Sequence, residues 1–324
     1  MDAVEPERPA QREPKRNRRT LVIAGAAVLV VVAILAVAGY LVFGRTSPGQ
    51  VAAKPAEHQT SPAPPPGPSE VVLPFGHGDA EGIDVDDAGN VYLADSVNNR
   101  VLVLKAGSNS PIELPFTGLN RPGGLAVDGS DVLYVVDQNN KRVLKLSAGS
   151  NTPTEFPISD LDDPHGMAVS SGGNVFVADF KGNRVVELQA GTGTRVEMPF
   201  TGLNKPYDLA VDGAGAVYVA DAGNYRVMKL VAGTTTQVIL PFTNLNFPNS
   251  VAVDHSNNVY VTDLNNNRVL KLTAGSNTVS ELPFTDLFAP YLVVVSSQGD
   301  VYVVGFGNRV LKMPSGYHAK PLGN

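Results

Sequence analysis

Residues 240–272 read LPFTNLNFPNSVAVDHSNNVYVTDLNNNRVLKL, and similar text recurs from residue 71 to the C-terminus. An apolar residue followed by proline marks each copy, and successive marks lie 41, 42, 42, 42 and 42 residues apart. The marks are Leu73, Leu114, Phe156, Met198, Leu240 and Leu282. A fixed period of this length is typical of a repeat architecture.

Each copy contains four short runs rich in Val, Tyr, Phe and Thr, separated by Gly, Asn, Asp or Ser. In the third copy they span residues 166–169, 174–178, 184–188 and 195–200. Apolar and polar residues alternate within the runs, which favours β-strands over amphipathic helices. Four strands in each unit predict a propeller blade, and six units predict an all-β, six-bladed propeller around a central channel.

The two ends of the repeat region complement each other. The sixth copy supplies three strands within residues 291–313, and Pro314-Ser-Gly-Tyr-His318 after them is a poor strand sequence. The missing strand is present as Glu70-Val-Val-Leu-Pro-Phe75. We expect this N-terminal strand to complete the last blade, because an open ring would expose unpaired strand edges.

Composition limits the chemistry of the chain. The sequence has 324 residues and no cysteine, which excludes disulfides, iron–sulfur clusters and thiolate zinc sites. Residues 1–69 hold 8 Lys/Arg and 5 Asp/Glu, whereas residues 70–324 hold 17 and 26. The predicted propeller is therefore acidic, which weighs against nucleic acid as a partner.

The first 69 residues predict a membrane anchor in three parts. Residues 1–20 form a basic tail, residues 21–43 are apolar and uncharged, and the proline-rich residues 44–69 predict a semi-rigid stalk. A helix over 21–43 is long enough to span a bilayer, and its basic N-terminal flank places the tail in the cytoplasm. The alternative is a signal peptide cleaved after Ala36-Val-Ala38. We expect a single-pass protein of the cell membrane, with residues 70–324 extracytoplasmic.

The blade core, Asp-x-x-x-Asn-Arg-Val with small variations, resembles the NHL repeat. It begins at Asp95, Asp137, Asp179, Asp221 and Asp263, whereas the sixth copy has Gly305 there and is one residue shorter. The phrases Leu-Lys-Leu-x-Ala-Gly-Ser-Asn-Thr at 144–152 and Leu-Pro-Phe-Thr-Gly-Leu-Asn at 114–120 resemble the extracytoplasmic sensor domain of PknD-type receptor serine/threonine kinases. The resemblance covers residues 70–316 and implies a sensor-like propeller, but the sequence contains no kinase motifs.

The repeated Asp and Arg lie five residues apart across the turn between two strands. A charge-assisted bond between them, or bonds from Asp to the backbone, would fix this turn. Five occurrences around the ring favour an architectural role over catalysis.

The predicted binding site lies where the inner strands begin, at one mouth of the channel. The first position reads Glu81, Gly123, His165, Tyr207, Asn249 and Tyr291, and the next includes Asp208 and Ser250. Six different residues at equivalent places are not required by blade geometry, although unconstrained drift would also produce them. We expect a ligand-binding group comprising Glu81, His165, Tyr207, Asp208, Asn249 and Tyr291.

Two function classes fit this pattern. The first is a sensor or scaffold that binds a cell-envelope ligand or an extracytoplasmic protein and needs no cofactor, metal or catalytic residue. The second is a metal-dependent hydrolase or lyase, because Glu81, Asp208 and Asn249 loosely resemble the metal ligands of gluconolactonase-like propellers. A catalytic zinc site usually needs three converging protein ligands. A single histidine such as His165 is more often a hydrogen-bonded wall residue.

Overall fold

The structure is a computed structural model that describes residues 69–76, 78–158 and 160–322. The predicted tail, transmembrane segment and nearly all of the stalk lie outside these residues, so their assignments stay predictions. The chain divides into two units, residues 1–63 and 64–324, and the second contains everything described below. Within the described residues, no helix has the length and apolar character needed to cross a membrane.

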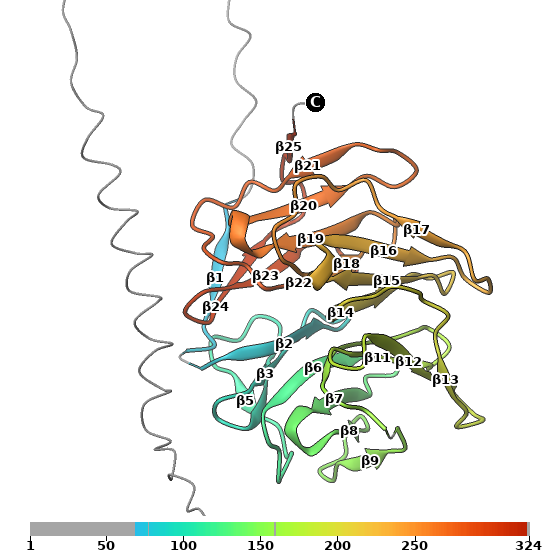
Figure 1. The fold of residues 1–324 in the computed structure, drawn as a ribbon. Helices are drawn as coiled ribbons and strands as arrows, with labels where there is room; N and C mark the ends of the chain where they lie inside the picture. The colour runs from blue at the N-terminus through green and yellow to red at the C-terminus, as the bar shows by residue number, and fades with distance from the viewer. Residues whose placement is uncertain (1–68, 77, 159, 323–324) are drawn as a thin grey trace, which may run out of the picture. The chain divides into compact units, whose positions relative to one another are not determined.

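Six antiparallel sheets form the six blades, as the sequence predicts (Figure 1). The inner strands are β2 (Ala80–Val85), β6 (Pro122–Val127), β10 (Pro164–Val169), β14 (Pro206–Val211), β18 (Pro248–Val253) and β22 (Leu292–Val295). The second strands are β3 (Val91–Asp95), β7 (Leu133–Asp137), β11 (Val175–Asp179), β15 (Val217–Asp221), β19 (Val259–Asp263) and β23 (Val301–Gly305). Every second strand is buried along its whole length, because a neighbouring blade covers each face.

The third and outer strands complete each blade. The third strands are β4 (Arg100–Leu104), β8 (Arg142–Leu146), β12 (Arg184–Leu188), β16 (Arg226–Leu230), β20 (Arg268–Leu272) and β24 (Arg309–Met313). The outer strands are β5 (Ile112–Glu113), β9 (Thr154–Phe156), β13 (Arg195–Glu197), β17 (Gln237–Ile239), β21 (Val279–Glu281) and β1 (Val71–Leu73). Short 3-10 turns η1 (Gln138–Asn140), η2 (Ala222–Asn224) and η3 (Leu264–Asn266) follow three of the second strands.

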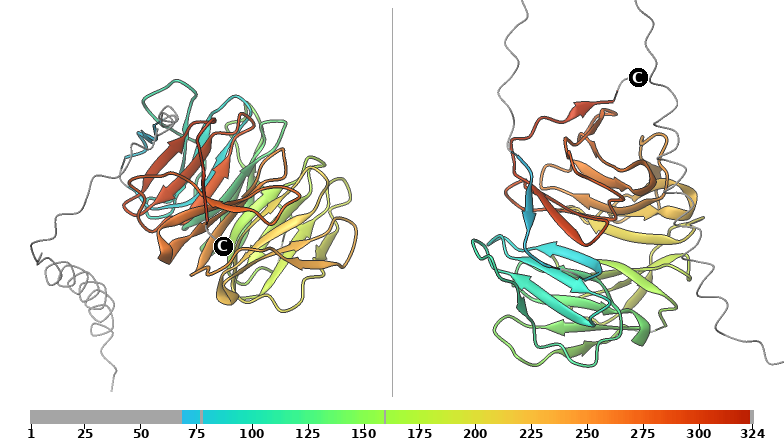
Figure 2. Two further views of the ribbon diagram at one scale, coloured as in Figure 1. Left: turned by 90° about the horizontal axis from the view of Figure 1, so that it is seen from above. Right: turned by 90° about the vertical axis from the view of Figure 1, so that its left-hand side faces the viewer.

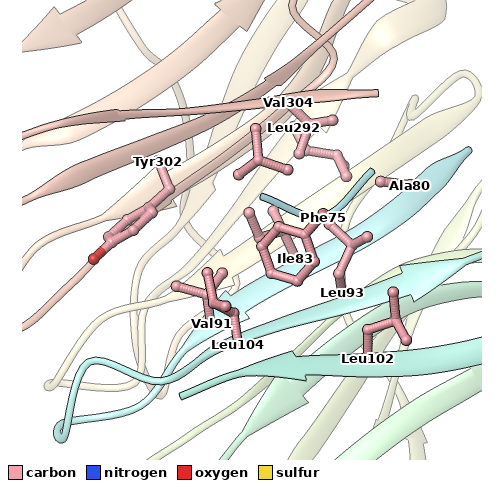
Figure 3. Packing of buried hydrophobic residues seen from close by; sticks show 11 residues of the cluster. Phe75, Ala80, Ile83, Val91, Leu93, Leu102, Leu104, Leu292, Tyr302 and Val304 are labelled. Carbon is pink, nitrogen blue, oxygen red and sulfur yellow. The ribbon is translucent and has the colours of Figure 1, made fainter. Parts of the chain in front are cut away.

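The predicted closure is confirmed. Strand β1 pairs with β24 of the last blade, with Val72 opposite Leu311 (Figure 2). The apolar cluster between the last and first blades joins Phe75 and Leu93 to Tyr302 and other residues of blade 6 (Figure 3). Equivalent clusters lie between the other neighbouring blades. The core is thus a ring of apolar interfaces, and β1 completes it by joining sequence-distant ends.

The C-terminal residues add a feature that the repeat pattern does not predict. Strand β25 (Lys320–Pro321) pairs with β21, so blade 5 has a fifth strand. The Leu322 N–H donates to the Val279 carbonyl at 3.2 Å. Blade 5 therefore shows that an outer edge of this propeller can accept a further strand.

The predicted Asp–Arg pairs form in the first five blades. The Arg Nε donates to the Asp carboxylate at 2.6–3.0 Å, and in four of these blades an Asn of the same turn also donates to it. In blade 6, which has Gly305, Arg309 contacts Asp286 instead. The Asn308 side chain there accepts from the Ala80 N–H of blade 1 at 2.7 Å. The last turn is thus tied to the ring closure rather than to its own strand.

Candidate binding site at the mouth of the channel

The predicted site residues lie where the inner strands are irregular. Pairing with the second strand shifts register between Ala80 and Gly82 in blade 1, and between Pro206 and Asp208 in blade 4. Comparable shifts follow the proline in blades 2, 3 and 5. A bulge of this kind re-aims a side chain, so it directs the first residues of these strands towards the channel mouth.

Glu81 connects three blades across the mouth. Its carboxylate accepts a hydrogen bond from Arg121 Nη2 of blade 2 at 3.0 Å and another from the Tyr207 hydroxyl of blade 4 at 3.2 Å. Blades 1 and 4 lie on opposite sides of the ring, so the second bond crosses the channel. Burial, and then the charge of Glu81, raise the pKa of Tyr207, which keeps its hydroxyl a donor. This bridge spans the mouth of a channel cavity of about 180 Å³.

His165 packs beside this bridge. Its ring centroid lies 4.5 Å from that of Tyr207 and 4.8 Å from that of Phe180. Its Nε2 lies 2.8 Å from Gln138 Nε2 and 3.7 Å from Asp163 Oδ1. Burial lowers the pKa of His165, although Asp163 opposes this effect, so the neutral ring is favoured beside the Gln138 amide. We call the group Glu81, Arg121, Gln138, His165, Phe180 and Tyr207 the mouth cluster.

Two further predicted site residues, Asn249 and Tyr291, contact each other. Asn249 is 2% exposed, and its Nδ2 donates to the Tyr291 carbonyl at 2.8 Å. The Tyr291 ring is half-buried against the apolar cluster between blades 6 and 1, and burial raises the pKa of its hydroxyl. In this structure both residues contribute to contacts between blades.

Asp208 lines the cavity below the mouth. It accepts a hydrogen bond from the Ser250 hydroxyl at 2.6 Å, and Ser250 Oγ in turn accepts from the Val293 N–H at 3.1 Å. These bonds connect blades 4, 5 and 6. Burial raises the pKa of Asp208 to about 6. A Cβ at Gly166 would lie 2.2 Å from Asp208 Oδ1, so glycine is needed opposite this carboxylate.

A second carboxylate in the cavity was not predicted. Asp84 accepts from the backbone N–H groups of Val85 and Val127, both at 2.8 Å. Burial raises its pKa to about 7, and the nearby Asp208 adds to the shift. The repeat does single out Asp84, because this position is apolar in the other five copies. The equivalent residues are Ala126, Ala168, Ala210, Ala252 and Val294.

Arg121, Gln138 and Phe180 were also missed. Arg121 precedes the proline of its inner strand, where other copies have Asp163, Lys205, Phe247 and Ala289. Gln138 and Phe180 follow the repeated Asp, where other copies have Ser96, Ala222 and Leu264. The residue before the proline and the residue after the repeated Asp vary between copies as much as the first residue of the predicted site. A comparison of all these positions would therefore have found Arg121, Gln138 and Phe180.

The residues that resemble metal ligands are held by protein partners. Glu81 contacts Arg121 and Tyr207, Asp208 contacts Ser250, and the Asn249 amide contacts a backbone carbonyl. Among residues 69–322, apart from the undescribed 77 and 159, no three His, Asp or Glu side chains are grouped to hold a metal ion.

Sequence comparison identifies the repeat. Residues 119–146, 161–188 and 245–272 match the NHL repeat, and each match ends with the third strand of its blade. The serine/threonine-protein kinase PknD of Mycobacterium tuberculosis is 46% identical over 112 residues, which is 33% of this chain and 15% of the kinase, in both strains CDC 1551 / Oshkosh and H37Rv. The matched region is thus a small part of the kinase.

Solved structures share the fold at low identity. A streptogramin B lyase has a TM-score of 0.59 and 15% identity, with 76% of this chain and 97% of the lyase covered. A putative gluconolactonase has a TM-score of 0.63 and 13% identity, with 81% and 96% covered. Such identities establish the fold alone. The chain therefore contains an NHL-repeat, six-bladed β-propeller that is similar, over a third of the chain, to the kinase PknD.

Proposed function

We propose that this chain is a membrane-anchored extracytoplasmic propeller that binds a ligand of the cell envelope at the mouth cluster, as a sensor or scaffold. The mouth cluster carries the proposal: four blades contribute side chains that the repeat does not share, and they contact one another in one place. The similarity to PknD and the predicted anchor of residues 21–43 support the location. PknD is a kinase, whereas the present sequence has no kinase motifs, so the proposal concerns binding only.

The mouth surface favours a ligand that carries carboxylates next to flat or apolar groups. The Arg121 side chain is 49% exposed although it contacts Glu81. Lys205 Nζ lies 5.9 Å from the centre of the Phe180 ring. Guanidinium and ammonium groups bind carboxylates, and adjacent rings stack on flat groups. A cell-wall glycopeptide has this chemistry.

The hydrolase or lyase alternative receives less support. The three candidate ligand positions are occupied by internal hydrogen bonds, and the similarity to the lyase and the gluconolactonase is one of fold. Thermal unfolding with EDTA, and then with calcium, zinc or magnesium, separates the two functions. A rise in Tm with metal that disappears in Glu81→Ala would favour the enzyme.

Titration of the full chain with glycopeptide fragments from digested cell wall tests the proposal. We expect Arg121→Ala and Phe180→Ala each to weaken binding about tenfold, since a charge-assisted bond or a ring contact contributes about 1.4 kcal/mol. Tyr225→Ala is the matched control, because this exposed tyrosine lies in the corresponding turn of blade 4, outside the mouth cluster. Equal affinities in all four proteins would contradict a site at the mouth.

A further inference from the structure

The outer strands differ in the charge of one residue. The residue before the apolar-proline mark is Glu113, Glu155, Glu197 and Glu281 in blades 1, 2, 3 and 5, but Ile239 in blade 4 and Val72 in blade 6. In blades 1–3 the glutamate lies 3.3–3.7 Å from the arginine of the third strand. Charged residues on an edge strand hinder its pairing with another edge. Blade 4 lacks this protection.

The edge of blade 4 is also apolar and exposed. Val238 and Ile239 of β17 are 41% and 59% exposed. The sequence from Leu230 to Val253 contains no charged residue. Uncharged, exposed strands of this composition are the ones that pair with a further strand.

The backbone of β17 is oriented to accept such a strand. The Thr236 carbonyl accepts from the Val231 N–H, and the Leu240 N–H donates to the Val227 carbonyl, so both groups point inward to the third strand of the blade. Inward and outward positions alternate along a strand, so Gln237 and Ile239 direct their backbone N–H and C=O groups outward. Val279, the counterpart of Gln237 in blade 5, uses its outward carbonyl to bind Leu322 beside β25. In the described part of the chain, no strand pairs with the outer edge of β17.

We propose that β17 pairs antiparallel with β17 of a second copy of this chain, with Val238 opposite Val238 on a two-fold axis. Gln237 then pairs with Ile239 of the second copy and Ile239 with Gln237, which gives about four backbone hydrogen bonds. The two valine side chains meet on one face of a continuous eight-stranded sheet formed by blade 4 of both copies.

Self-complementarity selects the second copy as the occupant. A two-fold axis through Val238 gives both strands the same uncharged residues at the contact. The position equivalent to Gln237, whose N–H must donate outward, is Pro111 in blade 1, Pro153 in blade 2 and the charged Arg195 in blade 3, and β25 already covers the edge of blade 5. The uncharged β17 is complementary to itself. The paired edges are short, so the dimer is weak in solution and a residue-specific assay is required.

Disulfide cross-linking of the full chain provides this assay, because the sequence has no cysteine. In Val238→Cys the two Cα atoms would lie about 4.5 Å apart, as in a non-hydrogen-bonded pair, which a disulfide can join. We expect the covalent dimer to form at least about tenfold faster than in Val196→Cys, the equivalent position of blade 3. Cross-linking of Val238→Cys no faster than that of Val196→Cys would overturn the proposal.

A second substitution separates pairing from folding. Ile239→Glu introduces the residue that blades 1–3 already have, where it contacts the arginine equivalent to Arg226, so the blade should fold normally. We expect it to abolish the rapid cross-linking of Val238→Cys while the Tm is unchanged. Val71→Cys is the equivalent substitution in β1, which also lacks the glutamate before the apolar-proline mark: faster cross-linking there than at Val238→Cys would assign the contact to blade 6 and overturn the proposal.

Discussion

Replacing Asp84 by alanine should remove a pH dependence that the channel adds to folding. Burial raises the pKa of Asp84 from its ordinary value of 3.8 to about 7. The folded chain therefore keeps a proton that the unfolded chain has already released. Such a group stabilises the fold most at low pH, and this contribution is lost as the pH rises through about 7. Alanine occupies the equivalent place in four other blades, so the fold accommodates it.

The magnitude follows from the two pKa values. One proton held by the folded state alone changes the free energy of unfolding by about 1.4 kcal/mol for each pH unit. With pKa values of 3.8 and about 7, the contribution of Asp84 falls by about 2.5 kcal/mol between about pH 5 and pH 8. Losing the hydrogen bonds to Val85 and Val127 lowers the free energy of unfolding of the variant by the same amount at every pH. The change in its slope against pH measures the proton that Asp84 holds in the folded state.

Urea unfolding of the full chain at several pH values measures this effect. As the pH rises from about 5 to about 8, the free energy of unfolding of the wild type should fall by about 2.5 kcal/mol relative to that of Asp84→Ala. Asp87→Ala, an exposed aspartate of the same blade, is the control and should give a curve parallel to the wild type. Parallel curves for Asp84→Ala as well would show that the channel leaves Asp84 ionised, which refutes the reasoning.

Two further predictions concern the blade framework. Asp221→Ala should lower the free energy of unfolding by about 3 kcal/mol, because this buried carboxylate accepts from two side chains and one backbone N–H. The control is Asp286→Ala, which removes the exposed ion pair of blade 6. Chemical denaturation should show that this control lowers the free energy of unfolding by less than about 1 kcal/mol. Gly166→Ala should cost about 2 kcal/mol or more, since its Cβ would overlap Asp208, including its Cα at 2.6 Å. Gly129→Ala has open space around its Cβ, so a Tm as low as that of Gly166→Ala would contradict the steric explanation.

Part of the candidate site could be predicted from single positions in the repeat. Variation at the start of the inner strands indicated Glu81, His165 and Tyr207, and the structure brings them together. The same variation indicated Asn249 and Tyr291, which instead contact each other and the core. A one-dimensional comparison cannot distinguish these cases, because it does not show which way a bulge turns each side chain. Arg121 and Phe180 lie at positions that also vary between the copies, but that variation does not show that the two side chains reach the same place.

The sequence by itself determined the architecture. The sequence has a 42-residue period, four alternating runs in each copy and a strand displaced to the N-terminus. Because apolar faces and strand edges must be covered, these features allow only a closed ring of six blades. Only the tertiary structure decided what lies at the channel. Glu81 and Tyr207 are 126 positions apart and meet because ring closure places blades 1 and 4 on opposite sides of a narrow mouth. Likewise, the pKa of Asp84 and that of Asp208 are raised by burial in the closed channel, which the local sequence does not show.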